Sequence, residues 1–304
     1  MRTIFWATSG AYIAAAMSGC RLWLHVDDPQ CDRDQACVDL FGAGATCVSG
    51  GVCSVPASRT GSDSQSVRAV PARWSCVRDE PEMVTLDSSR KLRVRMDVVD
   101  ASSLHVPEGL NGAACLADDV DCGRPVVEGV VPGGDGFMEF MLPYGFQGYF
   151  SLEAPDSLPV LAYNNRPYTE NLTTRGPPML TREVLDDVAA ASGNDPSDPE
   201  RGAVFLEIRD CNDVAGDGVR FDGVDAHTPF YFEGALPDPS LQQTAISNQL
   251  SAGREPRSVG GFVNLEPGST TFQAKWGDTQ EVLGRVTVEI KAGYITYVRI
   301  RAGY

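Results

Sequence analysis

Residues 91–100 read KLRVRMDVVD, and this stretch decides the fold class. Apolar and charged side chains alternate along it: Leu92, Val94, Met96 and Val98 are apolar, and Arg93, Arg95 and Asp97 are charged. Successive side chains of a β-strand point to opposite faces of a sheet. The alternation therefore predicts a strand with one face buried and the other in water.

Similar short segments lie on both sides of a central helical segment. Before it come GFMEFMLP (136–143), GYFSLEA (148–154) and LPVLAYN (158–164); after it come GAVFLEIRDC (202–211), GFVNLEP (261–267), TTFQAKW (270–276), GRVTVEI (284–290) and ITYVRIR (295–301). Short strands between Gly- and Pro-rich turns are typical of β-sandwiches. We predict a mainly β protein with two tandem sandwiches, over residues 73–192 and 202–304.

One short helix is predicted between the sandwiches, over residues 181–192 (TREVLDDVAAAS). Thr181 can cap its start, Glu183 lies in its first turn, and Gly193 follows its end. Residues 193–201 contain two prolines and form the predicted interdomain linker.

The first twenty residues, MRTIFWATSGAYIAAAMSGC, have the layout of a secretory signal peptide, with Arg2 as the only charge. The apolar part is too short to span a bilayer, which needs ~20 apolar residues. Met17–Ser18–Gly19–Cys20 resembles the bacterial lipobox, although Met17 stands where that motif usually has Leu. The resemblance implies removal of residues 1–19 and lipid on Cys20. An ordinary cleaved signal with an incidental cysteine is the alternative.

Nine cysteines are present, and those other than Cys20 are even in number: Cys31, Cys37, Cys47, Cys53, Cys76, Cys115, Cys122 and Cys211. An even set in an exported chain predicts disulfides, although eight cysteines allow roughly a hundred pairings. The first four lie in a short polar segment, 31–54, and should mostly pair with one another as a disulfide knot. Zinc is the alternative there, but its ligands usually include C-x2-C pairs, which this segment lacks.

Cys115 and Cys122 flank the turn-like LADDVD and should close it, which leaves Cys76 and Cys211 for each other. Residues 20–30 form a short tether before the knot. Residues 55–72 (VPASRTGSDSQSVRAVPA) have the composition of a flexible linker.

The chain carries a net charge of −16, and a surface this acidic repels phosphate backbones. We therefore expect no nucleic-acid partner. The sequence contains no G-x-S-x-G, no P-loop and no H-E-x-x-H motif, and has only three histidines. We predict that the protein is not an enzyme.

Five aspartates crowd one Gly-rich segment: Asp210, Asp213, Asp217, Asp222 and Asp225. Calcium takes several oxygen ligands at once, so these residues are a candidate calcium site, and calcium is the one cofactor that the sequence suggests. The alternative is that Asp and Gly simply favour turns.

Phe230, Tyr231 and Phe232 are consecutive, so a strand there should turn at least one ring outward. Exposed aromatics can stack on sugars or anchor a partner protein. A second dense set comprises Phe137, Phe140, Tyr144, Phe146, Tyr149 and Phe150. The alternative for both sets is sandwich core.

The two β regions also echo each other: RVRMDVVDASSLHVPEGL (93–110) and FLEIRDCNDVAGDGV (205–219) each run from a strand ending in Asp, through a polar turn, to Gly. On these residues the second region resembles the carboxypeptidase-regulatory or transthyretin-like fold, an immunoglobulin-like sandwich. The whole chain resembles predicted lipoproteins of the myxobacterial type. The resemblance implies a fold and an outer-membrane location, and implies no catalytic residues.

The sequence thus predicts a lipid-anchored envelope protein whose body binds another envelope protein or a glycan. A structural accessory subunit or spacer in a larger assembly is one alternative. A hydrolase with a non-standard site is another.

Overall fold

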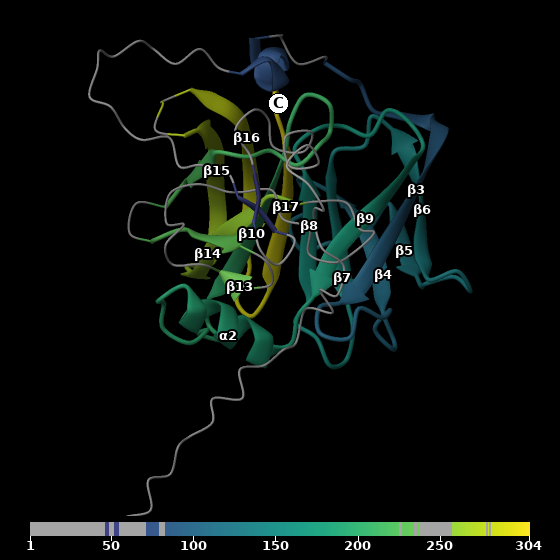
Figure 1. The fold of residues 1–304 in the computed structure, drawn as a ribbon. Coiled ribbons are helices and arrows are strands. Elements are labelled where there is room, and N and C mark those ends of the chain that lie inside the picture. The colour runs from purple at the N-terminus through teal and green to yellow at the C-terminus, as the bar shows by residue number, and fades with distance from the viewer. Residues whose placement is uncertain are drawn as a thin grey trace, which may run out of the picture.

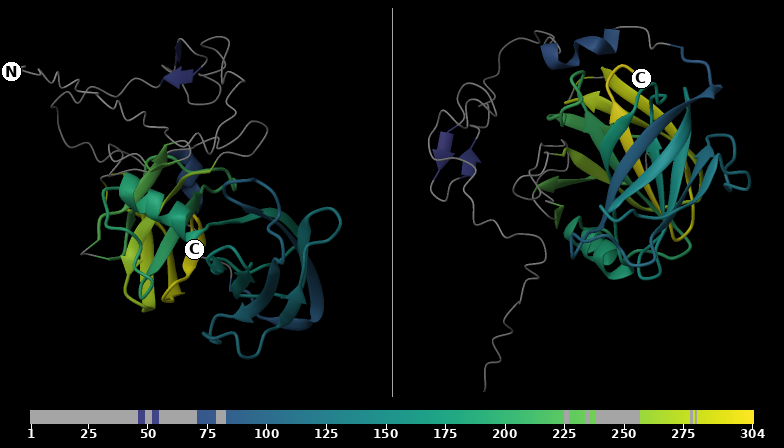
Figure 2. Two further views of the ribbon diagram at one scale, coloured as in Figure 1. Left: turned by 90° about the horizontal axis from the view of Figure 1, so that it is seen from below. Right: turned by 90° about the vertical axis from the view of Figure 1, so that its right-hand side faces the viewer.

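The computed structural model describes residues 46–48, 52–54, 71–78, 83–224, 227–233, 236–237, 257–277, 279 and 281–304. It is mainly β, with one short α-helix between two sandwiches, which confirms the predicted fold class (Figures 1 and 2). The first described elements are a hairpin of β1 (Thr46–Val48) and β2 (Val52–Ser54) and the 3₁₀ segment η1 (Ala72–Arg78).

The first sandwich contains β3 (Asp87–Asp100), β4 (Asn111–Leu116), β5 (Val127–Val130), β6 (Phe137–Tyr144), β7 (Gly148–Glu153), β8 (Val160–Asn164) and β9 (Leu172–Met179). The helix α2 (Arg182–Ala191) follows. The second sandwich contains β10 (Gly202–Arg209), β11 (Val219–Asp222), β12 (Phe230–Glu233), β13 (Leu236–Pro237), β14 (Val259–Leu265), β15 (Gly268–Trp276), β16 (Val282–Ile290) and β17 (Ile295–Arg301).

The two sandwiches share one sheet, which tandem domains do not imply. Nine strands form it, in the order β13-β12-β14-β10-β17-β8-β7-β4-β5. The join is the parallel pairing of β17 with β8, from Ile295 opposite Val160 to Arg299 opposite Asn164. Two three-stranded sheets, β6-β3-β9 and β11-β15-β16, complete the sandwiches.

The two small sheets pack on opposite faces of the shared sheet. Along β17, Ile295 and Tyr297 belong to the first core, which lies under β6-β3-β9, whereas Val298 and Ile300 belong to the second core, under β11-β15-β16. Neighbouring side chains of a strand point to opposite faces, so one strand serves both cores. Such two-sided burial explains why ITYVRIR and GAVFLEIR are buried along their whole length.

Helix α2 extends the first core. Its buried side chains are Leu185, Val188 and Ala189, and the Thr181 hydroxyl accepts a hydrogen bond from the Val184 N–H at 3.3 Å. Figure 1 shows α2 at one end of the molecule and the C-terminus at the other. The described residues contain no helix that is long and apolar enough to cross a membrane.

Two predicted disulfides are confirmed, Cys76–Cys211 and Cys115–Cys122. In the β1–β2 hairpin the backbone places Cys47 opposite Cys53. The predictions for Cys20, Cys31 and Cys37 lie outside the described residues, as do those for the leader and the linker over residues 55–70.

Candidate functional site

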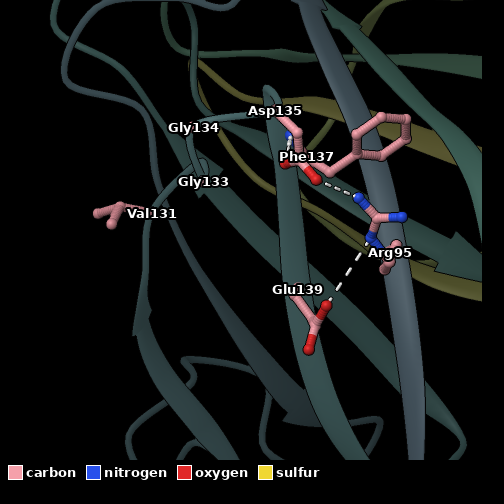
Figure 3. Close-up of a pocket in the computed structure, with 7 residues that line it drawn as sticks. All are labelled: Arg95, Val131, Gly133, Gly134, Asp135, Phe137 and Glu139. Carbon is pink, nitrogen blue, oxygen red and sulfur yellow. Dashed lines mark hydrogen bonds and ion pairs between the residues drawn. The ribbon is translucent and has the colours of Figure 1, made fainter.

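A shallow pocket of about 400 Å³ lies on the outer face of the first sandwich (Figure 3). Its residues come from β3, from β6 and from the turn that precedes β6: Arg95, Val131, Gly133, Gly134, Asp135, Phe137 and Glu139. The alternation that buries Val94 and Met96 turns Arg95 outward. The β3–β6 register sets Glu139 directly opposite it.

Arg95 is the centre of the pocket. Its Nη2 pairs with Asp135, its Nε lies 3.7 Å from Glu139 Oε2, and its guanidinium carbon lies 4.5 Å from the centre of the Phe137 ring. The carboxylate side chains are 60% and 48% exposed. Ion pairs this exposed are worth about 0–1 kcal/mol, so a ligand can compete for the Arg95 donors at little cost.

The turn beside β6 holds Asp135 in place. The Gly133 N–H donates to Phe137 O at 2.9 Å, and the Phe137 N–H donates to Asp135 Oδ1 at 3.2 Å. Gly136 has φ of +82°, a left-handed conformation that glycine adopts without strain. These contacts therefore hold the Asp135 carboxylate in a defined position in the turn.

The chemistry of this pocket suits binding of a polar ligand. It offers guanidinium donors, carboxylate acceptors and an aromatic side chain. Both carboxylates and the guanidinium can exchange their mutual contacts for hydroxyl groups of a ligand. With two carboxylates to one guanidinium, the pocket disfavours anions.

A second polar cluster is buried at the junction of the two sandwiches and centres on Glu207 of β10. Arg209 Nε donates to Glu207 Oε1 at 2.7 Å, Arg299 Nη2 donates to Oε2 at 3.2 Å, and the Tyr297 hydroxyl also donates to Oε2. Glu207 is fully buried. Burial alone would raise its pKa, but Arg299, Arg257 and Arg209 hold the pKa well below its ordinary value.

The arginines of this cluster also satisfy the free edge of β9. Arg299 Nη2 donates to Arg175 O at 2.9 Å, and Arg257 Nη2 donates to Gly176 O at 3.0 Å. The edge of a strand otherwise leaves such carbonyl groups unpaired. The cluster thus joins the small sheet β6-β3-β9 to the shared sheet by polar contacts, and its burial suits a structural role.

The candidate calcium ligands face basic side chains. Asp210 pairs with Arg73 at 3.2 Å, Asp213 with Arg301 at 2.9 Å, Asp217 with Arg73 at 3.3 Å and Asp222 with Lys275 at 2.6 Å. Asp225 lies outside the described residues. Within the described part of the chain, no three His, Cys, Asp or Glu side chains form a group that could hold a metal.

The candidate binding surface at Phe230, Tyr231 and Phe232 needs at least one outward-facing ring, but Phe230 and Tyr231 are sandwich core, which was the alternative. Phe230 is 3% exposed in the first core, Tyr231 is fully buried in the second, and Phe232 packs partly buried against Phe230. The hypothesis of a binding surface here assumed a strand with one face exposed to water. Strand β12 belongs to the shared sheet, where both faces are covered.

Sequence reasoning missed both polar sites. The charges within GAVFLEIR and ITYVRIR were a usable signal for the Glu207 cluster, because charged residues in two-sided buried strands must find partners. Nothing local signals the pocket, which depends on the β3–β6 register.

The sequence matches no protein-family model and no curated protein. Among solved structures, the Bacillus anthracis TIE protein is 11% identical over 70% of this chain, with a TM-score of 0.20; this chain spans 34% of its length. A mutant form of the shaft pilin SpaA from Lactobacillus rhamnosus GG is 9% identical, and a CBM26 module of Eubacterium rectale Amy13K, solved with maltoheptaose, is 11% identical. Each aligns with 70% of this chain, at a TM-score of 0.22, and this chain covers 98% and 93% of them. Similarities this low assign neither a family nor a function.

Proposed function

We propose that this chain is an exported envelope protein, held to an outer membrane by lipid on Cys20, whose body binds a ligand and catalyses no reaction. The disulfides Cys76–Cys211 and Cys115–Cys122 support export, because such bonds persist mainly outside the reducing cytosol. They also place four of the nine cysteines in pairs. Assigning Cys20 to lipid leaves an even number of cysteines, which agrees with such pairing.

The pocket around Arg95 carries the binding role. Planar polar side chains beside an aromatic ring suit a sugar, whose hydroxyls both donate and accept hydrogen bonds. The excess of carboxylates favours a neutral glycan over an acidic one. We therefore favour a neutral glycan of the cell envelope over a protein partner.

Replacing Arg95 tests the pocket. Arg95→Ala should weaken binding of a neutral oligosaccharide about tenfold or more, because a hydrogen bond to a charged group contributes about 1.5–3 kcal/mol. An array of neutral and acidic bacterial oligosaccharides identifies the ligand, and titration calorimetry gives the Kd. Arg93→Ala, on the same face of β3 but outside the pocket, is the matched control. Equal losses in the two variants, or no binding by the unaltered protein, would refute the pocket.

Replacing Cys20 tests the anchor. Cys20→Ser should move the protein from the membrane fraction to the soluble fraction, since acyl chains each contribute ~0.8 kcal/mol per buried methylene to membrane binding. Immunoblots of separated fractions give the readout. Retention of the variant on membranes would contradict the lipid anchor.

A structural spacer is the second candidate, and the shared nine-stranded sheet favours it. Continuous pairing from β13 to β5 makes the two sandwiches one stiff body. Size measurement of the detergent-extracted protein separates the two roles. A stable large complex would favour the spacer, and a monomer would favour the ligand-binding module.

A further inference from the structure

Residues 71–78 precede the first sandwich in the sequence but pack on the second. Trp74, in η1, is 1% exposed within the second core, and its ring centre lies 6.1 Å from that of Trp276. Figure 1 shows η1 at the same end of the molecule as the C-terminus, opposite α2. We name residues 71–78 the strap.

The second sandwich is shaped to receive the strap. A Cβ at Gly216 would lie 2.3 Å from the Trp74 ring, and one at Gly303 would lie 2.8 Å from Cys76 O. Arg73 Nη2 donates to Ala215 O at 2.6 Å. These contacts come from two separate segments of the second sandwich, so the strap is held on both sides.

Polar and covalent bonds lock the strap in place. The Cys211 N–H donates to Arg73 O at 3.1 Å, and Arg73 also pairs with Asp210 and Asp217. The disulfide Cys76–Cys211 then closes a loop with a sequence separation of 135. That loop contains the whole first sandwich, β3 to β9, with its Arg95 pocket, and also α2 and β10.

We propose that the strap delivers mechanical load from the N-terminal tether to the second sandwich and so keeps that load off the start of β3. The role in the cell rests on the proposed lipid anchor, whereas the load path is a property of the folded chain. A pull from upstream of residue 71 reaches Cys76 and crosses the disulfide to Cys211. Because Cys76 is fixed to the folded body, the segment beyond it cannot be stretched.

Without the Cys76–Cys211 disulfide and the Arg73 contacts, the same pull would reach β3 at Asp87. Strand β3 holds the pocket's central Arg95, and it pairs with β6 and β9 through hydrogen bonds along its length. A load at one end of a strand breaks such bonds one after another, whereas a covalent bond to the second sandwich spares them. The disulfide thus keeps load on the tether from reaching the strand that carries the Arg95 pocket.

Force spectroscopy tests the load path on the purified mature chain. One handle is attached within the linker over residues 55–72, after the cysteines of residues 31–54, and one at a short tag inserted in the exposed turn at Asp156, between β7 and β8. The double variant Cys76→Ser/Cys211→Ser should show an early low-force extension, from peeling of β3, which the unaltered protein lacks. The variant Cys115→Ser/Cys122→Ser, which loses a disulfide outside the load path, is the matched control.

The same early extension in the unaltered protein would overturn the proposal, as would its absence from the double variant. If the double variant does not fold, dithiothreitol added to the folded, mounted protein should produce the early extension instead, in the control variant as well. The measurement uses no membrane, so its failure is distinct from that of the Cys20→Ser fractionation.

Discussion

Glu207 shows how one buried charge can be kept in a β-sheet core. Its carboxylate accepts hydrogen bonds from Arg209, Arg299 and Tyr297, and Arg257 lies close by, bonded to the Tyr297 hydroxyl at 3.1 Å. Burying a charge without partners costs several kcal/mol, so the full set of donors offsets the loss of water. The partners come from β10, from β17 and from Arg257, which precedes β14, so the stability of this cluster depends on several segments of the junction.

Glu207→Gln should lower the free energy of unfolding by about 3–5 kcal/mol at pH 7, because it leaves buried arginines without their counter-charge. Urea unfolding followed by circular dichroism measures the change. Glu139→Gln, which alters an exposed glutamate of the pocket, should change stability by about 0–1 kcal/mol. Similar costs for the two variants would contradict the role assigned to Glu207.

The same residue gives a pH dependence with a definite sign. The folded-state pKa of Glu207 lies well below its ordinary value of 4.5, so its stabilisation is fully present above that pH. It is lost as the pH falls from 4.5 through the folded-state pKa. The stability difference between the unaltered protein and Glu207→Gln should therefore shrink below pH 4.5. Stability curves that stay parallel as the pH is lowered from neutral into this acidic range would rule this out.

At the scale of single elements, η1 shows that position in the sequence and position in the fold can differ. Its seven residues, too few for a core of their own, are ordered because Trp74 enters the second core. On either side of Trp74, the Cys76–Cys211 disulfide and the hydrogen bond from Arg73 to Ala215 O hold η1 on the second sandwich. The element is therefore stable only as part of the second sandwich.

Trp74→Ala should cost about 3–5 kcal/mol of stability, since it empties a site that the surrounding side chains cannot refill. Trp74→Phe keeps an aromatic ring in that site and should cost clearly less. Chemical unfolding with the disulfides intact gives both values. A cost below about 1 kcal/mol for the alanine variant would show that the strap is held by its disulfide alone.

At the scale of the whole molecule, the shared sheet makes the two sandwiches one unit. Strand β17 is hydrogen-bonded to β10 of the second sandwich and to β8 of the first, and its side chains enter both cores. Neither core can lose β17 without exposing apolar surface in the other. Folding of the two sandwiches is therefore coupled through this strand.

We expect the body to unfold in a single cooperative transition. Scanning calorimetry should give a calorimetric enthalpy equal to the van't Hoff enthalpy, as for a two-state domain. Glu207→Gln, which weakens the junction, is the variant in which the transition would first split. Two resolved transitions in the unaltered protein would mean that the sandwiches fold independently.

The two disulfides should also differ in what they contribute to stability. Loss of Cys76–Cys211, with a separation of 135, should cost about 5 kcal/mol, and loss of Cys115–Cys122, with a separation of 7, about 2 kcal/mol. The difference arises because a longer loop restricts the unfolded chain more. Unfolding of the paired serine variants measures it, and the reverse order would contradict the loop argument.

The sequence by itself determined the elements that depend on local pattern. Alternation along residues 91–100 predicted β3, and the cap at Thr181 and the Gly after the helix predicted α2. The even cysteine count predicted disulfides, the short spacing of Cys115 and Cys122 predicted their bond, and elimination left Cys76 for Cys211. Each of these signals lies within a few residues of the element it specifies, or in a count over the chain.

Only the tertiary structure decided how these elements meet. The β17–β8 join links residues about 135 positions apart, and no periodicity encodes which strand edge will be its partner. At the far end of the same sheet, Phe230 of β12 enters the first core and Tyr231 enters the second, so both are buried. The β10–β17 pairing sets Glu207 opposite Arg299, and the β3–β6 register sets Arg95 opposite Glu139. Both sites arise from pairings between distant segments, whose energy is defined only once the sheet has formed.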